Sequence, residues 1–218
     1  MSRHTTRRLF WIPIVHTAAD LGTLEGRVRQ LHHRRGGTSA WQDRVKQVGL
    51  LWRSIRTRIF QLNLDFTRVL LYQDGLPVCG KEDRIVEDLA RTGSANHRLL
   101  LELRARGAKL MGTESPDLLI EEYELNRQLL LNESPPAEGV LEEVRRLSSD
   151  LLDRRDAFIA RRIDETLGAD QIGCLFLGLM HSIDGRLPAD ITVDRLQFSV
   201  PSAERAGTSP GSGAAEPA

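Results

Sequence analysis

The sequence predicts an α/β fold with a mostly parallel sheet of about four to five strands and helices on both faces of the sheet. Two observations support this prediction. Short, nearly unbroken apolar runs recur along the 218 residues, and segments with helical apolar spacing lie between them. An unbroken apolar run is typical of a strand that helices cover on both faces. Right-handed crossovers between such strands place them in parallel.

The strands can be placed from these runs. Four buried strands are predicted at residues 9–15, 68–72, 108–111 and 173–177. A fifth segment, residues 191–198, alternates imperfectly between apolar and polar residues, which suits an edge strand.

Helices are predicted between the strands, at residues 41–64, 94–106, 115–131 and 140–167. Ser94 is a suitable N-cap, because its hydroxyl can accept a hydrogen bond from a free backbone N–H of the first turn. Pro116 suits the start of a helix, where its missing N–H costs nothing. The segment Gly36-Gly37-Thr38-Ser39 is predicted to be a loop.

Composition limits the domain organisation and the partners. We expect one domain over residues 1–200 and a disordered tail over 201–218, which is rich in Gly, Pro, Ser and Ala. Thirty basic residues balance thirty acidic ones, which disfavours a nucleic-acid partner. No apolar run reaches the ~20 residues that span a bilayer, so no membrane partner is expected. Cys79 and Cys174 form no disulfide framework and no metal-binding motif, which favours the cytoplasm.

Titratable residues follow each of the four predicted buried strands. In open parallel sheets, ligands bind outside the carboxyl ends of the strands, so these residues are candidates for a common site. They are His16, Asp20, Asp74, Glu114, His181 and Asp184.

Each candidate has a functional and a structural interpretation. His16 and His181 suit a general base or a metal ligand, because imidazole titrates near neutral pH, but either could instead cap a backbone group. Glu114 precedes a predicted helix N-terminus, whose dipole would keep the carboxylate ionised for chemistry or would simply be complemented by it. Asp74 lies in an Asp-Gly turn sequence. Asp20 is a weaker candidate, since a turn or cap residue is equally expected there.

Arg155 is the most informative residue away from the strand ends. Its neighbours at three and four residues on either side are Leu151, Leu152, Phe158 and Ile159, so its guanidinium projects from an apolar stripe. An unpaired buried charge would cost about 3–5 kcal/mol, which predicts a partner, either Glu114 or a bound anion. The alternative is an arginine whose stem packs while its head reaches water.

Two further acidic residues, Glu121 and Glu122, follow Glu114 by one to two helical turns. They could point towards the same site. A solvated helix face is the expected arrangement for such a pair.

The order of motifs resembles a known superfamily. A strand ends in Pro-Ile-Val-His16, another in Gly-Thr-Glu114, a helix carries Arg155-Asp156, and a last strand ends in Gly-Leu-Met-His181. This order is similar to the superfamily of TraB-like proteins, Tiki metalloproteases, erythromycin esterases and ChaN-like haem-binding proteins. The resemblance implies an α/β core with a site built from His16, Glu114, Arg155 and His181. The chain departs from it in having Pro13 where that pattern has glycine.

These observations lead to three functional hypotheses. The preferred one is a hydrolase acting on a small molecule or peptide, with His16, Glu114, Arg155 and His181 as catalytic residues. A divalent metal held by His16, Glu114 and His181 would activate water, or these residues would do so directly. Asp74, Asp20 and Asp156 are then candidate ligand-binding residues. The alternatives are a non-catalytic module that binds a small ligand or haem through His16 or His181, and an interaction protein with a vestigial cleft.

Overall fold

The chain forms a five-stranded sheet with the strand order β3-β2-β4-β1-β5, in which every neighbouring pair is parallel. The computed structural model describes residues 6–15, 25–131 and 138–198, with the backbone alone described at 25–41, 44, 128–131 and 138. The strands are β1 (Arg7–Ile14), β2 (Val69–Gln73), β3 (Lys109–Met111), β4 (Ile172–Gly178) and β5 (Ile191–Arg195). The predicted fold class is confirmed, including the place of β5 at an edge.

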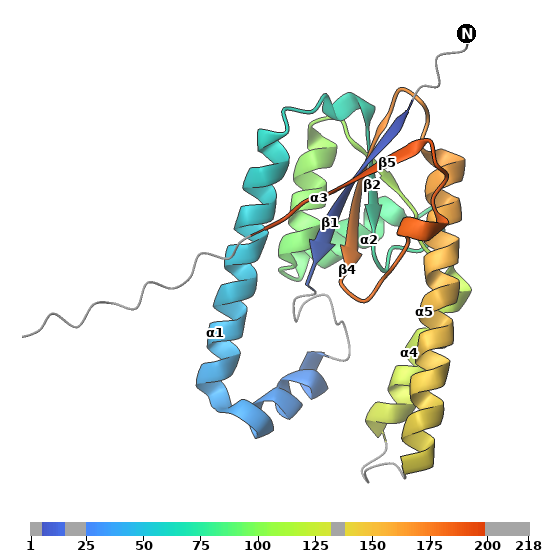
Figure 1. Cartoon of the computed structure of the whole chain (residues 1–218). Helices are drawn as coiled ribbons and strands as arrows, with labels where there is room; N and C mark the ends of the chain where they lie inside the picture. The colour runs from blue at the N-terminus through green and yellow to red at the C-terminus, as the bar shows by residue number, and fades with distance from the viewer. Residues whose placement is uncertain (1–5, 16–24, 132–137, 199–218) are drawn as a thin grey trace, which may run out of the picture.

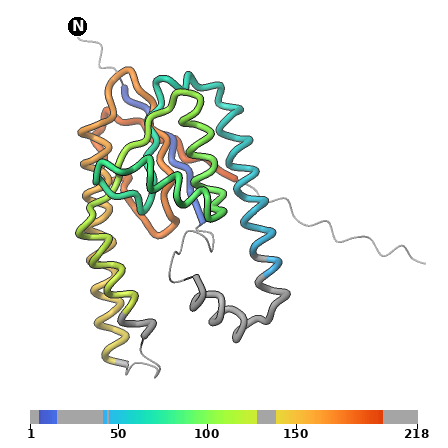
Figure 2. The backbone as a smooth tube through the Cα atoms, turned by 180° about the vertical axis from the view of Figure 1, so that it is seen from behind, coloured from blue at the N-terminus to red at the C-terminus, as the bar shows by residue number. Residues whose placement is uncertain are grey.

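Helices cover both faces of this sheet, as predicted. They are α1 (Glu25–Gln61), α2 (Glu82–Arg91), α3 (Ala95–Ala105), α4 (Pro116–Leu131) and α5 (Glu138–Thr166). One face carries α1, α2 and α3, and the other carries α5 (Figure 1). Seen from behind, α4 runs alongside α5, and the two form a hairpin that extends beyond the sheet (Figure 2). No described helix combines the length and the apolar character that crossing a membrane requires.

The two faces of β1 show why the strands are apolar throughout. Phe10 and Ile12 pack into the core beneath α1, α2 and α3, whereas Leu9 and Trp11 pack into the core beneath α5. All four side chains are buried. Successive side chains of a strand point to opposite faces, so a strand with a core on both sides needs an unbroken apolar run.

Pro13 is tolerated inside a central strand because of the register. Leu196 N donates to Trp11 O, so the backbone groups of Trp11 face β5. Pro13 has the same orientation two residues later, but the pairing of β1 with β5 ends at the pair Trp11–Arg195. The N–H that proline lacks would therefore have had no partner strand to donate to.

One local prediction differs from the structure, and one helix was not predicted. The predicted loop at Gly36-Gly37-Thr38-Ser39 is wrong, because α1 runs through it. A helical glycine costs only about 1 kcal/mol relative to alanine, and long helical flanks on both sides outweigh that cost. Helix α2 is also missing from the prediction, although its apolar residues Ile85, Val86, Leu89 and Ala90 recur at helical spacing. The predicted tail at 201–218 lies outside the described residues.

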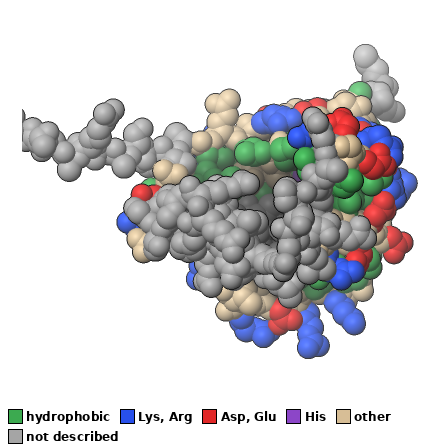
Figure 3. Space-filling view, turned by 90° about the horizontal axis from the view of Figure 1, so that it is seen from below, with side chains coloured by type: hydrophobic (Ala, Val, Ile, Leu, Met, Phe, Trp, Pro, Cys, Tyr) green, Lys and Arg blue, Asp and Glu red, His purple; other side chains and the backbone are tan. Residues whose placement is uncertain are grey.

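The strand connections define where a site can form. The chain passes over the α1–α3 face on its way to the edge strand β3, and returns over the α5 face to β4 and β5. Connections from neighbouring strands then leave the carboxyl edge in opposite directions, which opens a crevice there. Viewed from that end of the molecule, described side chains of both charge signs ring the surface (Figure 3).

Candidate functional site

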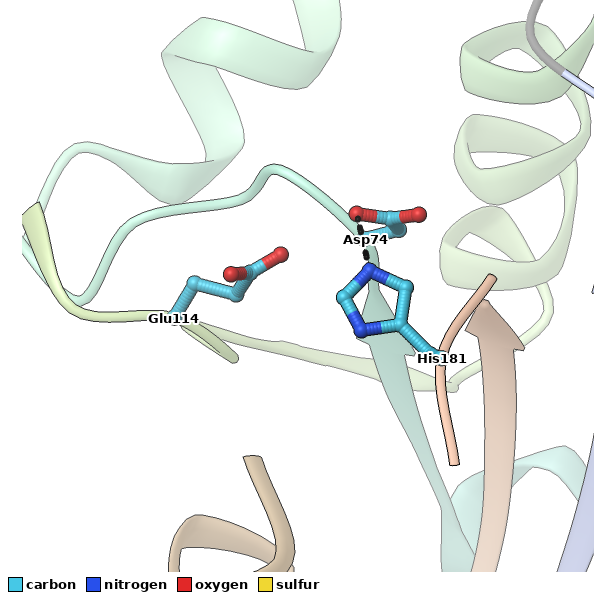
Figure 4. A group of neighbouring side chains, drawn as sticks. All are labelled: Asp74, Glu114 and His181. Atoms are coloured by element: carbon cyan, nitrogen blue, oxygen red, sulfur yellow. Dashed lines mark ion pairs between the residues drawn. The ribbon is translucent and has the colours of Figure 1, made fainter. Parts of the chain in front are cut away.

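Three strand ends bring a carboxylate, a second carboxylate and an imidazole together. Asp74 directly follows β2, Glu114 comes three residues after β3, and His181 comes three residues after β4. One ligand atom from each lies within 4.8 Å of the others (Figure 4). Exposed fractions are 7% for Asp74, 0% for Glu114 and 8% for His181. We call these three residues the strand-end cluster.

The loops after β2 and β3 are fixed to each other, which positions the two carboxylates. Gly75 N donates to Glu114 Oε1 at 2.7 Å, from a backbone with φ of 75° that favours glycine. Gln73 N donates to Thr113 Oγ1 at 2.8 Å, and Val78 N donates to Glu114 O at 2.9 Å. Glu114 therefore sits in a frame that both loops hold.

Arg155 projects from α5 into the cluster and has the partner that its apolar surroundings predicted. Its Nε donates to Glu114 Oε2 at 2.6 Å and its Nη2 to Glu114 Oε1 at 2.7 Å. Nη2 also donates to Asp74 Oδ1 at 3.0 Å. Burial lowers the pKa of Arg155, but the ion pairs outweigh burial and keep the pKa above its ordinary value. The guanidinium is therefore a permanent charge that holds two carboxylates in place.

The position of Glu122 differs from the solvated helix face that the sequence predicts. It was assigned to a solvated helix face, yet Arg155 Nη1 donates to Glu122 Oε1 at 2.6 Å. Its side chain is 38% exposed, so it covers the outer side of the Arg155 guanidinium and is itself only partly in contact with water. Glu121 does lie on the surface, where it pairs with Arg154. The two ion pairs tie α4 to α5 next to the cluster.

His181 is held by carboxylates at both ring nitrogens. Its Nδ1 lies 2.5 Å from Asp156 Oδ1, and Ser182 N donates to Asp156 Oδ2 at 2.7 Å. Its Nε2 lies 3.6 Å from Asp74 Oδ1. Burial lowers the pKa of His181, but the interactions with Asp156 and Asp74 outweigh burial and raise the pKa to about 9. The ring is therefore an imidazolium at neutral pH.

The carboxylates of Glu114 and Asp74 have different surroundings. Burial raises the pKa of Glu114, and the ion pair with Arg155 acts against that rise. Both oxygens of Glu114 already accept hydrogen bonds from Arg155. Asp74 Oδ2 accepts a hydrogen bond from Gly178 N at 2.9 Å, while its Oδ1 lies between Arg155 and His181. All four side chains are buried, and within the cluster Asp74 Oδ1 and His181 Nε2 face each other.

The predicted site residues divide into three groups. The structure brings Asp74, Glu114, Arg155, Asp156 and His181 together. Asp184 does not belong to the site, because it pairs with Arg195 at the surface. His16 and Asp20 lie outside the described residues, so their predicted roles stay predictions.

The sequence analysis did not identify the contact that Gly178 makes with the site. Its backbone N–H holds Asp74, a contact that no residue type signals because every residue except proline carries that donor. The role of Glu122 did have a signal, since it follows Glu114 at a spacing of two helical turns.

Comparison with known proteins adds no assignment: no family model, no curated protein and no solved structure matches the chain. The similarity of motif order to the TraB-like and erythromycin-esterase superfamily therefore stays a prediction. The functional argument rests on the geometry of the strand-end cluster.

Proposed function

We propose that the chain is a hydrolase whose active site is the strand-end cluster, with an ester or amide as substrate. The single observation that carries the proposal is the position of His181 Nε2, which lies 3.6 Å from Asp74 Oδ1 while Asp156 holds Nδ1. A carboxylate on one ring nitrogen orients the imidazole, and the other nitrogen is then directed at the reacting groups. Both groups lie where open parallel sheets bind ligands.

In this proposal the chemistry divides between Asp74 and His181, which face each other. Asp74 accepts a proton from a water molecule as the water oxygen bonds to the carbonyl carbon of the substrate. His181, protonated at neutral pH, donates a proton to the leaving oxygen or nitrogen as its bond to that carbon breaks. The products are a carboxylic acid and an alcohol or amine, so atoms and charge balance.

Glu114 and Arg155 have a supporting role in this proposal. Arg155 donates to both Glu114 and Asp74, so the pair orients Asp74. Of the two partners predicted for Arg155, Glu114 or a bound anion, the structure shows Glu114, and the other donors of Arg155 serve Asp74 and Glu122. Arg155 is therefore a positioning residue.

The donor set also fits a divalent metal. Ligand atoms at 2.0–2.2 Å from a common ion lie at most about 4.4 Å apart. The cluster atoms lie within 4.8 Å of one another, so a small inward movement of the side chains would let them share an ion. Asp156 on His181 Nδ1 is the kind of carboxylate that supports a metal-binding histidine. Asp74, Glu114 and His181 would hold the ion, which would supply Lewis-acid activation of water. Asp74 then takes the place in the ligand set that the sequence assigned to His16.

A haem-binding role through His181 has less support. A haem would have to lie against the ligating nitrogen, whereas His181 is 8% exposed and its Nε2 faces Asp74. We therefore propose the hydrolase alone.

The test is a hydrolysis assay on the purified full chain. The substrates are p-nitrophenyl acetate and butyrate and a fluorogenic peptide mixture, each with EDTA and with added Zn²⁺ or Mn²⁺. His181→Gln and Asp74→Asn should each lower kcat by about 10²–10⁴, the usual contribution of general acid–base catalysis. Asp170→Asn is the matched control, since Asp170 is 92% exposed and should leave kcat unchanged. Absence of turnover under every condition, or full turnover by His181→Gln, would contradict the proposal.

A further inference from the structure

A hollow lies between α1 and α3, on the face of the sheet opposite α5, and shares no residue with the strand-end cluster. It has a volume of about 350 Å³, within the range of pockets that hold small molecules. Helices α1 and α3 lie side by side there (Figure 1 and Figure 2). Three arginines line it, Arg53, Arg56 and Arg98, together with one carboxylate, Glu102. Its lining therefore has a net charge of +2.

The excess charge belongs to two of the arginines. Arg56 donates to both oxygens of Glu102, at 2.8 and 2.6 Å, and Arg106 approaches the same carboxylate at 3.6 Å. Among the described residues, no carboxylate lies within ion-pair distance of Arg53 or Arg98. The nearest group that serves Arg98 is a neutral one, Gly93 O, at 3.1 Å.

The other walls add an anion-stabilising dipole and an apolar floor. Helix α3 begins at Ala95, which lines the hollow, and a helix N-terminus carries partial positive charge. Trp52 is 4% exposed and lines the hollow. Its indole Nε1–H is buried and has no acceptor in the described part of the chain. An acceptor oxygen on a ligand that reaches it would satisfy this donor.

Gly49 keeps the hollow open. A Cβ at this position would meet only Arg53 Nη1, at 3.9 Å, so the space beside it is empty. Glycine is an unfavourable residue inside a helix, and this one lies within α1 on the wall of the hollow.

From these observations we infer that the hollow between α1 and α3 binds a small organic phosphate, with Arg53 and Arg98 on the phosphate and Trp52 against the body of the ligand. Guanidinium groups match the oxygens of a phosphate in geometry as well as charge. A phosphate monoester carries close to two negative charges at neutral pH, which balances the lining. This inference does not depend on the proposed hydrolase, because it uses none of the residues of the strand-end cluster.

Isothermal titration calorimetry on the full chain tests the inference, with inorganic phosphate, AMP and glucose 6-phosphate as probes and glucose as the uncharged control. Wild type should bind at least one of the two esters with Kd below about 1 mM, and glucose should not bind. The double variant Arg53→Gln, Arg98→Gln should weaken binding at least tenfold. Gly49→Leu should do the same by filling the hollow.

Two controls separate the site from general charge. Gly49→Ala leaves most of the space open and should bind within twofold of wild type. Arg127→Gln with Arg145→Gln removes two exposed arginines from α4 and α5, and should also bind within twofold of wild type. Absence of binding to any probe at 10 mM, equal loss in the remote double variant, or full binding by Gly49→Leu would each overturn the inference.

Discussion

Replacing Arg155 by methionine tests how the buried charges are held. Arg155→Met removes three hydrogen bonds to Asp74 and Glu114 and leaves Glu114, which is 0% exposed, with Gly75 N as the only donor among the described residues to its carboxylate. Removing one partner of a buried ion pair costs about 3–5 kcal/mol. For a chain of this length that loss lowers Tm by about 6–20 °C.

The assay is urea unfolding followed by circular dichroism at pH 7, with the neighbouring Arg154→Met as control. Arg154 makes a two-pronged ion pair with Glu121, but both side chains are about half exposed. Its loss should change the free energy of unfolding by no more than about 1 kcal/mol. The contrast between two adjacent arginines isolates burial as the cause.

The pH dependence provides a second criterion. Without Arg155, burial and the nearby charge of Asp74 raise the pKa of Glu114 further in the folded state, opposed only by the hydrogen bond from Gly75 N. A raised carboxyl pKa destabilises the folded state as pH rises above the unfolded value of about 4.3. The deficit of Arg155→Met relative to wild type should therefore grow between pH 4 and pH 7. Equal stability of the two proteins at pH 7 would refute the reasoning.

Two further predictions concern His181 and the thiols. Because the folded pKa of His181 is about 9 and the unfolded value about 6.5, its contribution of about 3 kcal/mol should be complete below pH 6.5 and lost as pH rises to about 9. Urea unfolding of the metal-free protein should show this slope, and His181→Gln should lack it; an equal slope in the variant would contradict the assignment. Cys79 is exposed, whereas burial raises the pKa of the Cys174 thiol to about 12. Titration with a thiol reagent at pH 8 should modify one cysteine in the native protein and two in urea, and rapid modification of both in the native protein would contradict the burial of Cys174.

The fold was predictable where burial leaves a pattern in the sequence. Strands β2 and β4 are buried along their length, and that burial requires the apolar runs from which they were predicted. Pro116 likewise marks the start of α4. Helix α2 was overlooked although its apolar residues Ile85, Val86, Leu89 and Ala90 recur at helical spacing, and the glycines within α1 resemble a loop locally. The strand order, with β4 inserted between β1 and β2, depends on long-range pairing that no short window records.

The site was predictable in its members more than in its contacts. The strand-end rule selected Asp74, Glu114 and His181, and the apolar surroundings of Arg155 required a partner. The sequence could not distinguish which carboxylate serves which cation. Asp156 holds His181, whereas Glu114 holds Arg155, because the rotation of α5 about its axis directs these adjacent side chains to different partners.

The most direct test addresses the imidazolium of His181, on which the proposed catalysis depends. NMR titration of the histidine side chains in the metal-free protein, with His181→Gln used to assign the resonance, measures its pKa. The structure predicts a value of about 9, and a lower value in Asp156→Asn, where the carboxylate on Nδ1 is lost. A pKa near the ordinary 6.5 in the wild-type protein would contradict the arrangement of Asp74, His181 and Asp156 from which the hydrolase is inferred.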